Sequence, residues 1–430
     1  MLAAGIGFVA SLSLMFLRVP IAIALGLVGL IGFGWIVGWN QAGVMLALVT
    51  RESSMTYGLV VIPLFILMGN FVAGAGISGD LYRAAQAYLG HRRGGLATAT
   101  VAACGGFSAV CGSSVATVVT IGKVALPSMA KYNYSGRLST ASVAAGATLG
   151  IIIPPSILLV IYGIMTETHI GKLYVAGLLP GLLGALFYVL AVQWSVWRKP
   201  GDAPVAERAS KEERLQALKG VWPICLLFFG VIGGIYAGFF TAVEAAGIGA
   251  FGAFLLALAN RRLTWERLTD ILYDSAKTSS MLIVLLIGAS IFTEFLNYTG
   301  AHRGLLSFVN DSGLPPVGVI LLICAIYVVL GALMEELSML LLTVPLFFPI
   351  VTGLGYDPVW FGVLVVVLCE LGLIAPPVGV NLFVVRTIAP DVPLSEIIYG
   401  IVPFIVANIF RIILIAVFPA VFLILPNTLF

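Results

Sequence analysis

Charged side chains are scarce in this chain, and their scarcity excludes a soluble protein. Only 10% of its 430 residues are charged and 60% are hydrophobic, whereas soluble domains carry about a quarter charged residues. Apolar runs such as 173–196 and 402–425 are long enough to cross a hydrocarbon core of roughly 30 Å. No Lys or Arg precedes Arg18, so the first run is a poor signal peptide and is expected to be a membrane helix. The sequence predicts an all-α polytopic membrane protein.

Catalytic and metal-binding patterns are also missing. The chain has three histidines and no HExxH, its five cysteines show no CxxC spacing, and the P-loop and GxGxxG signatures are absent. These absences disfavour an enzyme, a zinc site and direct coupling to ATP, so an ion gradient is the expected energy source. The net charge of +3 is spread over loops and needs no acidic partner, and nothing indicates nucleic-acid binding.

The sequence contains an internal repeat that divides the chain into two similar halves. Pro127 and Pro349 are 222 positions apart, and "LGIIIPPS" at 149–156 matches "LGLIAPPV" at 371–378 with the same offset. We therefore predict a first repeat at 1–196, a basic linker at 197–219, and a second repeat at 220–430.

Each half reads as the same series of segments. A pair of helices is followed by a single helix, an apolar pair folded about a polar tip, a long helix broken by Pro-Pro, and a final helix. In the first half these are 3–17, 19–38, 57–75, 94–129, 139–165 and 173–196. In the second half they are 220–238, 242–260, 278–297, 315–352, 358–386 and 398–424. The tips are "CGSS" at 111–114 and "GALMEELS" at 331–338.

The distribution of basic residues predicts the topology. If each folded pair is a re-entrant hairpin, every half has five crossings, and the odd number inverts the second repeat. With the basic linker 197–219 placed in the cytoplasm, only Arg51, Lys172 and Arg303 fall in loops on the outer side. This bias favours two inverted-topology repeats with both termini on the periplasmic side.

The broken helices and hairpin tips mark a central site. Irregular backbone at membrane depth is tolerated where it lines a cavity, and prolines leave preceding carbonyls without N–H partners. Carbonyls of 150–155 with the hydroxyls of Ser113, Ser114 and Ser156 are candidate sodium ligands, as are 372–377 with Ser338 and Asn381. The half-helix that begins after each Pro-Pro presents its N-terminus to an anion.

Acidic residues embedded in apolar segments are a second signal, because charge at membrane depth is costly. Glu335 and Glu336 stand where the first tip has Ser113 and Ser114, and they are candidate cation ligands, gating contacts or solvated tip residues. Glu370 has no acidic counterpart in the first half, which leaves a structural ion pair and a transport role equally open. For Arg411, helix pairing or snorkelling is expected.

The chain resembles a known family along its whole length, the large membrane subunit (DctM) of the tripartite ATP-independent periplasmic, or TRAP, transporters. The resemblance lies in five motifs in the same order: "RVPIAIALG" at 18–26, "IPLFILMGN" at 62–70, "GHRRGGLATATV" at 90–101, "IIPPSILLVIYG" at 152–163 and "FGVLVVVLCELGLIAPPVGVNLFVV" at 361–385.

The resemblance implies an elevator-type, sodium-coupled symporter of organic acids in the bacterial inner membrane. A periplasmic binding protein would deliver the substrate and a small four-helix (DctQ-type) subunit, expected as a separate chain, would support the permease. The paired helices and the final helix of each half are expected to form a scaffold around a moving core. A stand-alone sodium symporter of anions without a binding protein is the alternative, while a channel and a membrane enzyme are more distant rivals.

The resemblance also implies site residues at the tips and broken helices. Substrate binding is assigned to four residues: Ser114, Ser156, Glu336 and Asn381. Sodium binding, for two ions, is assigned to Gly112, Ser113, Gly150, Pro154, Glu335, Ser338, Gly372, Pro376 and Gly379. Pro155 and Pro377 belong to the same motifs. The first tip departs from the Gly- and Ser-rich run of the family, and the substrate stays open among dicarboxylates, sugar acids and amino-acid-like solutes.

Overall fold

Every regular element that the structure describes is a helix. The structure is a computed structural model that describes residues 2–261, 263–311 and 313–429, with side chains described except at 308–311. The elements up to the linker are α1 (Leu2–Phe16), α2 (Ile21–Val37), α3 (Trp39–Met55), η1 (Tyr57–Val60), α4 (Val61–Gly74), α5 (Ile77–Leu89), α6 (Gly95–Cys111), α7 (Ser114–Lys131), α8 (Gly136–Gly146), η2 (Ala147–Ile151), α9 (Ile157–Met165), α10 (Ile170–Arg198) and η3 (Pro200–Asp202). The elements that follow are α11 (Lys211–Tyr236), α12 (Ala242–Ala259), α13 (Trp265–Thr299), α14 (Ala301–Asp311), α15 (Pro316–Gly331), α16 (Glu336–Gly353), α17 (Pro358–Ile374), α18 (Val380–Ile388), α19 (Leu394–Val417) and α20 (Pro419–Leu429).

The two folded pairs and the two broken helices are present. α6 and α7 are joined by a turn at 112–113, and α15 and α16 by a turn at 332–335. The long helix predicted at 139–165 is interrupted after η2, and the one predicted at 358–386 is interrupted between α17 and α18. The prediction that Pro-Pro breaks both helices is confirmed.

Three helices lie where no helix was predicted, namely α3, α5 and α14. Their apolar residues are too few to read as membrane spans, and they are amphipathic. The helix predicted at 278–297 begins at Trp265, because the Thr264 side chain accepts a hydrogen bond from the Arg267 N–H and caps the helix start. The linker predicted at 197–219 is likewise helical at its end, where Ser210 and Glu213 form a capping box at the start of α11.

Seven described helices are long and apolar enough to cross a membrane by length and composition. They are Tyr57–Gly74 (η1 with α4), α10, α11, α12, α13, α16 and α19. Shorter apolar helices, including α6, α15 and α17, lie between them. At about 1.5 Å per residue, the 17 residues of α6 and the 16 residues of α15 fall short of a hydrocarbon core of roughly 30 Å.

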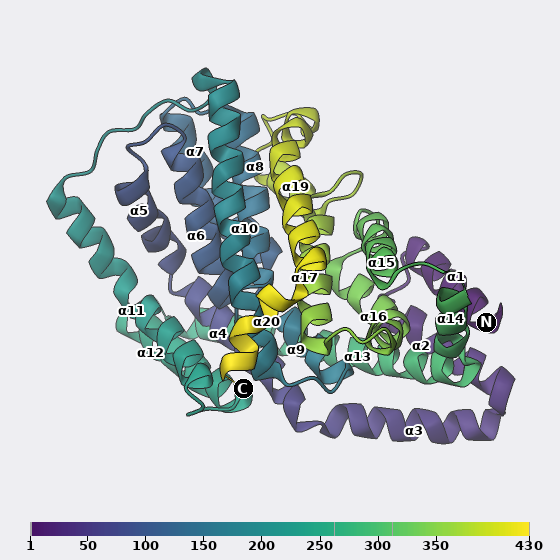
Figure 1. Ribbon diagram of the computed structural model, residues 1–430. Helices are drawn as coiled ribbons and strands as arrows, with labels where there is room; N and C mark the ends of the chain where they lie inside the picture. Colours follow the sequence, from purple (N-terminus) through teal and green to yellow (C-terminus); the bar gives the residue numbers. More distant parts are fainter. Residues whose placement is uncertain (1, 262, 312, 430) are drawn as a thin grey trace.

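The helices pack as two groups. α1, α2, α4, α11, α12 and α13 form a frame in which α2 packs on α13 and α4 packs on α12. α6–α10 and α15–α19 form a central group, and α4 reaches it through α6 and α9. In Figure 1, α10 and α19 stand side by side in the middle, α11 and α12 lie at the left, and α3 runs along the lower edge.

One prediction about this arrangement was wrong. The final helix of each half was expected to join the paired helices, but α10 and α19 pack on each other and on the broken helices α8 and α17. The reason is chemical, because α19 carries Arg411, whose charge finds its partner on α17 inside the central group.

The frame depends on a close approach of backbones between α2 and α13. A Cβ built on Gly288 would lie 2.2 Å from the Ala22 carbonyl oxygen, so any side chain there would force the helices apart. Small residues that let helix backbones touch are the usual basis of helix association in membranes, where lipid tails remove the hydrophobic driving force.

We expect Gly288→Ala to lower the free energy of unfolding by about 1–3 kcal/mol, the usual cost of overpacking. The matched control is Gly43→Ala on α3, where a Cβ would meet nothing within 4 Å. It should be neutral or stabilising by up to about 1 kcal/mol, because Ala favours the helix over Gly. Thermal unfolding of the detergent-purified proteins measures both, and equal effects would contradict this account of the frame.

Candidate functional site

The first hairpin tip is a glycine turn followed by a capped helix. Gly112 ends α6 with φ +66°, a left-handed conformation that favours glycine, and its N–H donates to the Ser108 carbonyl over 2.7 Å. Ser113 is the N-cap of α7, and its Oγ accepts from the Ala116 N–H at 3.3 Å. The tip therefore presents the N-terminus of α7.

The first broken segment ends in a second capped helix. After η2 the chain is non-helical through Ser156, and the Pro154–Pro155 peptide bond is cis. Ser156 is the N-cap of α9. Its Oγ accepts from the Leu159 N–H at 3.2 Å and donates to the Ile151 carbonyl. Ser156 is fully buried, and both hydrogen bonds of its hydroxyl lie within the protein.

The tip and the broken segment of the first half pack directly on each other. A Cβ on Gly150 would lie 2.1 Å from the Cβ of Ser108 on α6, so only glycine permits this contact. A Cβ on Gly112 would lie 3.4 Å from Ile157 Cδ1. The predicted residues Gly112, Ser113, Gly150 and Ser156 thus come together as one cluster.

In the second half the broken segment also packs on its hairpin, but its Pro-Pro pair differs in exposure from that of the first half. A Cβ on Gly372 would lie 2.7 Å from Gly331 Cα at the end of α15, and the Val378 N–H donates to the Ala332 carbonyl at 3.2 Å. Gly379 is the N-cap of α18 and has φ +45°. Pro376 and Pro377, joined by a cis bond, are exposed, whereas Pro154 and Pro155 are buried.

The acidic tip residues differ from one another. Glu335 occupies the N-cap position of α16, makes no capping hydrogen bond and is exposed. Glu336 is partly buried, and its Oε2 has no hydrogen-bond partner among the described residues. Its carbonyl accepts from the Cys369 Sγ of α17 at 3.7 Å. Ser338, two residues after Glu336, is buried.

Asn381 joins the two halves. Its Nδ2 donates to Ser114 Oγ at 2.7 Å and to the Ala144 carbonyl at 3.0 Å, and the side chain is fully buried. Ser114 is the first residue of α7 and Asn381 the second residue of α18, so two helix N-termini meet here. The Asn381 Oδ1 is buried and has no partner in the described residues.

Sequence reasoning predicted Asn381 and Ser114 but could not find the carbonyls of Ala144 and Ala332. Main-chain carbonyls leave no mark on the sequence. The signal that could have located them is their position, since Ala144 precedes the break by a few residues and Ala332 follows the end of α15.

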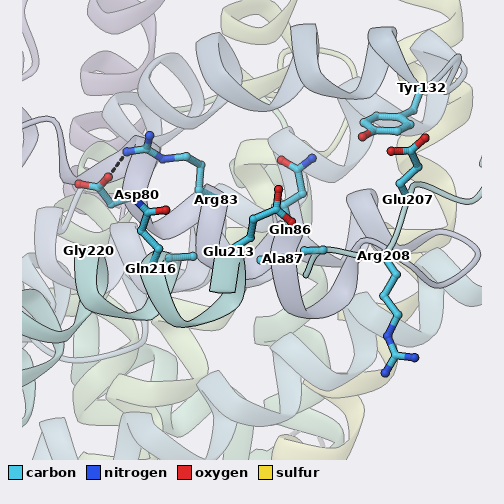
Figure 2. Close-up of a pocket in the computed structure, with 12 residues that line it drawn as sticks. Asp80, Arg83, Gln86, Ala87, Tyr132, Glu207, Arg208, Glu213, Gln216 and Gly220 are labelled. Carbon is cyan, nitrogen blue, oxygen red and sulfur yellow. Dashed lines mark hydrogen bonds and ion pairs between the residues drawn. The ribbon is translucent and has the colours of Figure 1, made fainter. Parts of the chain in front are cut away.

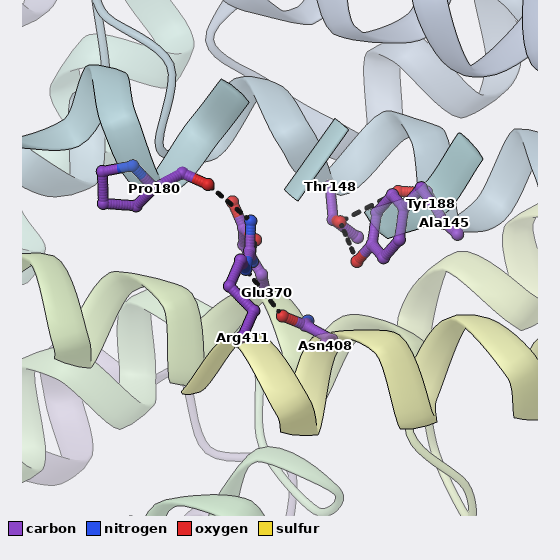
Figure 3. A network of polar contacts seen from close by, with 7 residues as sticks. All are labelled: Ala145, Thr148, Pro180, Tyr188, Glu370, Asn408 and Arg411. Carbon is purple, nitrogen blue, oxygen red and sulfur yellow. Dashed lines mark hydrogen bonds and ion pairs between the residues drawn. The ribbon is translucent and has the colours of Figure 1, made fainter. Parts of the chain in front are cut away.

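A buried ion pair links two helices of the central group (Figure 3). Arg411 on α19 contacts Glu370 on α17, both side chains being fully buried. Arg411 Nε donates to Asn408 Oδ1 at 3.0 Å, and Nη1 lies 3.4 Å from the Pro180 carbonyl of α10. Of the two alternatives left open for Glu370, the structure contains the ion pair, and Arg411 is its pairing partner.

A second polar contact lies beside the ion pair. Thr148 Oγ1 and the Tyr188 hydroxyl are 3.2 Å apart, which links η2 to α10. Thr148 also donates to the Ala145 carbonyl at 2.9 Å. Both broken segments are therefore tied to α10, the first through Tyr188 and the second through Arg411.

A separate polar pocket of about 490 Å³ lies between α5, α11 and the linker (Figure 2). Its lining includes Asp80, Arg83, Glu207 and Arg208, with Tyr132 from just after α7. None of the predicted site residues lines it. Its charges are of both signs, so it does not select an anion or a cation by charge.

A family model and individual relatives of this chain point to the same protein family. Residues 8–421 match the family described as "Tripartite ATP-independent periplasmic transporter, DctM component". The chain is 37% identical over 386 residues to the C4-dicarboxylate TRAP transporter large permease protein DctM of Pseudomonas aeruginosa, covering 89% of this chain and 90% of that protein. It is 34% identical over 381 residues to the isethionate TRAP transporter permease protein DctMQ of Oleidesulfovibrio alaskensis, covering 87% of this chain and 59% of that protein.

The fold resembles that of a solved membrane protein. The crystal structure of the YdaH transporter of Alcanivorax borkumensis aligns with a TM-score of 0.60 at 16% identity, covering 89% of each chain. This similarity supports a polytopic all-α membrane fold.

We expect Arg411→Met to lower the free energy of unfolding by about 3–5 kcal/mol, because it leaves the buried Glu370 carboxylate without its partner. The double variant Glu370→Leu with Arg411→Met should recover most of this loss. The control is Arg83→Met, which removes an ion pair with Asp80 whose Arg side chain is 68% exposed and should cost about 0–1 kcal/mol. Thermal unfolding in detergent would contradict the assignment if the Arg411 and Arg83 variants lost equally little.

Proposed function

The chain belongs to the DctM family of TRAP transporter large permease subunits, and from this membership we propose that it takes up an organic acid anion coupled to sodium. The family consists of transporter permeases, so the chain is a multi-pass membrane permease component and not an enzyme. In the proposed cycle, a periplasmic binding protein delivers the anion and sodium ions bind with it.

The observation that carries the anion site is the hydrogen bond between Asn381 and Ser114. It brings the N-termini of α18 and α7 together, and helix N-termini combine unpaired N–H groups with a positive dipole end. A carboxylate placed there would accept from these groups. The N-terminus of α9, capped by Ser156, lies next to the tip at Gly112 and adds a third donor end.

Sodium coupling is supported by the supply of hard oxygen atoms. The first cluster offers the hydroxyls of Ser113 and Ser156 beside the carbonyls of the break, and the second offers Glu335, Glu336 and Ser338 near the carbonyls of 372–377. Ser156 and Glu336 were assigned to the substrate from sequence, and this proposal moves them to the sodium ligands because a hydroxyl and a carboxylate are hard oxygen donors and a carboxylate repels an anion. We assign one sodium ion to each cluster. The Asn381 Oδ1, which has no partner among the described residues, is a further neutral oxygen next to the first tip.

The element bounds support a duplication, and inversion of its second copy is part of the proposal. α7 and α16 begin at 114 and 336 and end at 131 and 353, so both pairs of bounds are 222 positions apart. α8 and α17 begin at 136 and 358 with the same offset. An odd number of crossings in each half would place the two hairpins on opposite sides of the membrane.

An elevator movement is supported by the packing. The central group holds both tips, both broken helices, α10 and α19. It meets the frame through α4 and α16, and through α5, which lies between α6 of the central group and α11 of the frame. A body held together by its own ion pair and glycine contacts can slide against a frame without breaking its site. In this proposal α10 and α19 move with the site.

The proposal extends to partners and to membrane sides. We propose a DctQ-type small subunit, which is supported by the relative named DctMQ, of which this chain matches 59%. We place the protein in the bacterial inner membrane with the basic linker in the cytoplasm and both termini in the periplasm.

Uptake into proteoliposomes tests the function. Vesicles containing the chain and its small subunit should accumulate one member of a panel of C4-dicarboxylates, isethionate and other organic acids only with the binding protein and an inward sodium gradient. A potassium gradient is the control. Uptake without the binding protein would favour a stand-alone symporter, and uptake independent of sodium would overturn the cation assignment.

We expect Asn381→Leu to reduce uptake by on the order of tenfold or more. The change leaves the buried Ser114 Oγ and Ala144 carbonyl without their hydrogen-bond donor, at a cost of about 1–3 kcal/mol. The matched control is Asn40→Leu on α3, where the side chain is exposed and uptake should stay unchanged. Both proteins should elute as the parent does in size-exclusion chromatography. Wild-type uptake by the Asn381 variant would contradict the site.

A further inference from the structure

An apolar groove runs between the exposed faces of α10 and α19. It encloses about 1000 Å³, and its walls include Leu190, which is 53% exposed, Val406, which is 60% exposed, and Phe410, which is 54% exposed. The rings of Phe187 and Phe410, with centroids 5.6 Å apart, bridge the two helices. Neither Arg411 nor Glu370 is among the residues that line the groove.

One end of the groove is basic and aromatic. Arg137, Arg198 and Lys199 line it, and Asp202 is the acidic residue among its described lining residues. The Arg198 guanidinium carbon lies 5.1 Å from the centre of the Trp194 ring, and the rings of Trp194 and Trp197 are 5.3 Å apart. The positive charge is thus held beside two exposed indoles.

The backbone fixes the position of Arg137 at this end. Pro403 lies within α19 and has no N–H, so the carbonyl four residues earlier, that of Tyr399, loses its helical partner. Arg137 Nη2 donates to that carbonyl at 3.1 Å. Its guanidinium is therefore anchored at the mouth of the groove.

The length of the groove matches one leaflet. From Phe187 to Arg198 the helix rises about 16 Å, close to half of a hydrocarbon core of roughly 30 Å. Trp residues concentrate at the interface between hydrocarbon and headgroups, which is where Trp194 and Trp197 stand when α10 spans the membrane.

We propose that this groove binds a phospholipid with an anionic headgroup from the leaflet that faces the linker. An acyl chain lies along Leu190, Val406 and Phe410, and the phosphate group meets Arg198, Lys199 and Arg137. Basic pockets between membrane helices select anionic lipids in this way. A free anion would not contact the apolar wall. An apolar partner helix would leave the excess of basic over acidic residues at the mouth uncompensated. A lipid with an anionic headgroup fits both parts of the groove.

The test measures lipid retained by the full chain. Detergent-purified protein is incubated with equal amounts of phosphatidylglycerol and phosphatidylcholine, and bound lipid is counted by native mass spectrometry. The parent should retain phosphatidylglycerol preferentially. The double variant Arg198→Gln with Lys199→Gln should retain roughly tenfold less. Its control, Arg92→Gln with Arg93→Gln, removes two exposed adjacent cations outside the groove and should retain as much as the parent.

A groove-filling variant provides an independent readout. Val406→Trp should exclude the acyl chain and lower retention of phosphatidylglycerol while all cations remain. Equal retention of both lipids by the parent, or unchanged retention in the two groove variants, would overturn the proposal. If Val406→Trp instead lost the small subunit and kept its lipid, the groove would be a protein interface and the proposal would fail.

Discussion

The structure depends on one constraint, which is that main-chain polar groups at membrane depth must find partners inside the protein because the bilayer offers no water. Two helices are broken and two hairpins turn within the central group, so each break leaves carbonyls and N–H groups to satisfy. Ser113 and Ser156 cap the helices that follow the first tip and the first break. Asn381 reaches across to the Ala144 carbonyl of the opposite half. The polar groups left over at these breaks are those from which the proposed site is built.

The same constraint explains why the central group holds together. Gly150 and Gly372 allow each broken segment to touch its own hairpin at backbone distance. The ion pair of Glu370 and Arg411 then ties α17 to α19, and Arg411 also approaches α10. A buried pair contributes little net stability compared with apolar residues of the same size. Its role here is to fix the register of α17 against α19, since neither charge can leave its position without losing its oppositely charged partner.

Much of this arrangement could be predicted from sequence, and the rest could not for physical reasons. Paired prolines in register marked both breaks, because a proline in the interior of a helix removes a main-chain hydrogen bond and its ring clashes with the preceding turn. α3, α5 and α14 escaped prediction because hydropathy detects spans, and these helices are amphipathic. Ser114 and Asn381 were identified separately. They are 267 positions apart in sequence, so their contact depends on how the two halves pack against each other. The place of α10 and α19 was mistaken because the order of helices does not reveal which neighbours share a buried charge.

The two halves have equivalent geometry but different chemistry, and the difference bears on the proposed division of roles. The N-terminus of α7 carries the neutral Ser113 and Ser114, so its dipole remains free to attract an anion. The N-terminus of α16 carries Glu335 and Glu336, whose negative carboxylates compensate the positive end of its helix dipole. An anion approaching the second tip would meet negative charge, whereas a cation would gain from it. In the proposed mechanism the second tip therefore favours sodium more strongly than the first, and the anion binds on the side of Ser114 and Asn381.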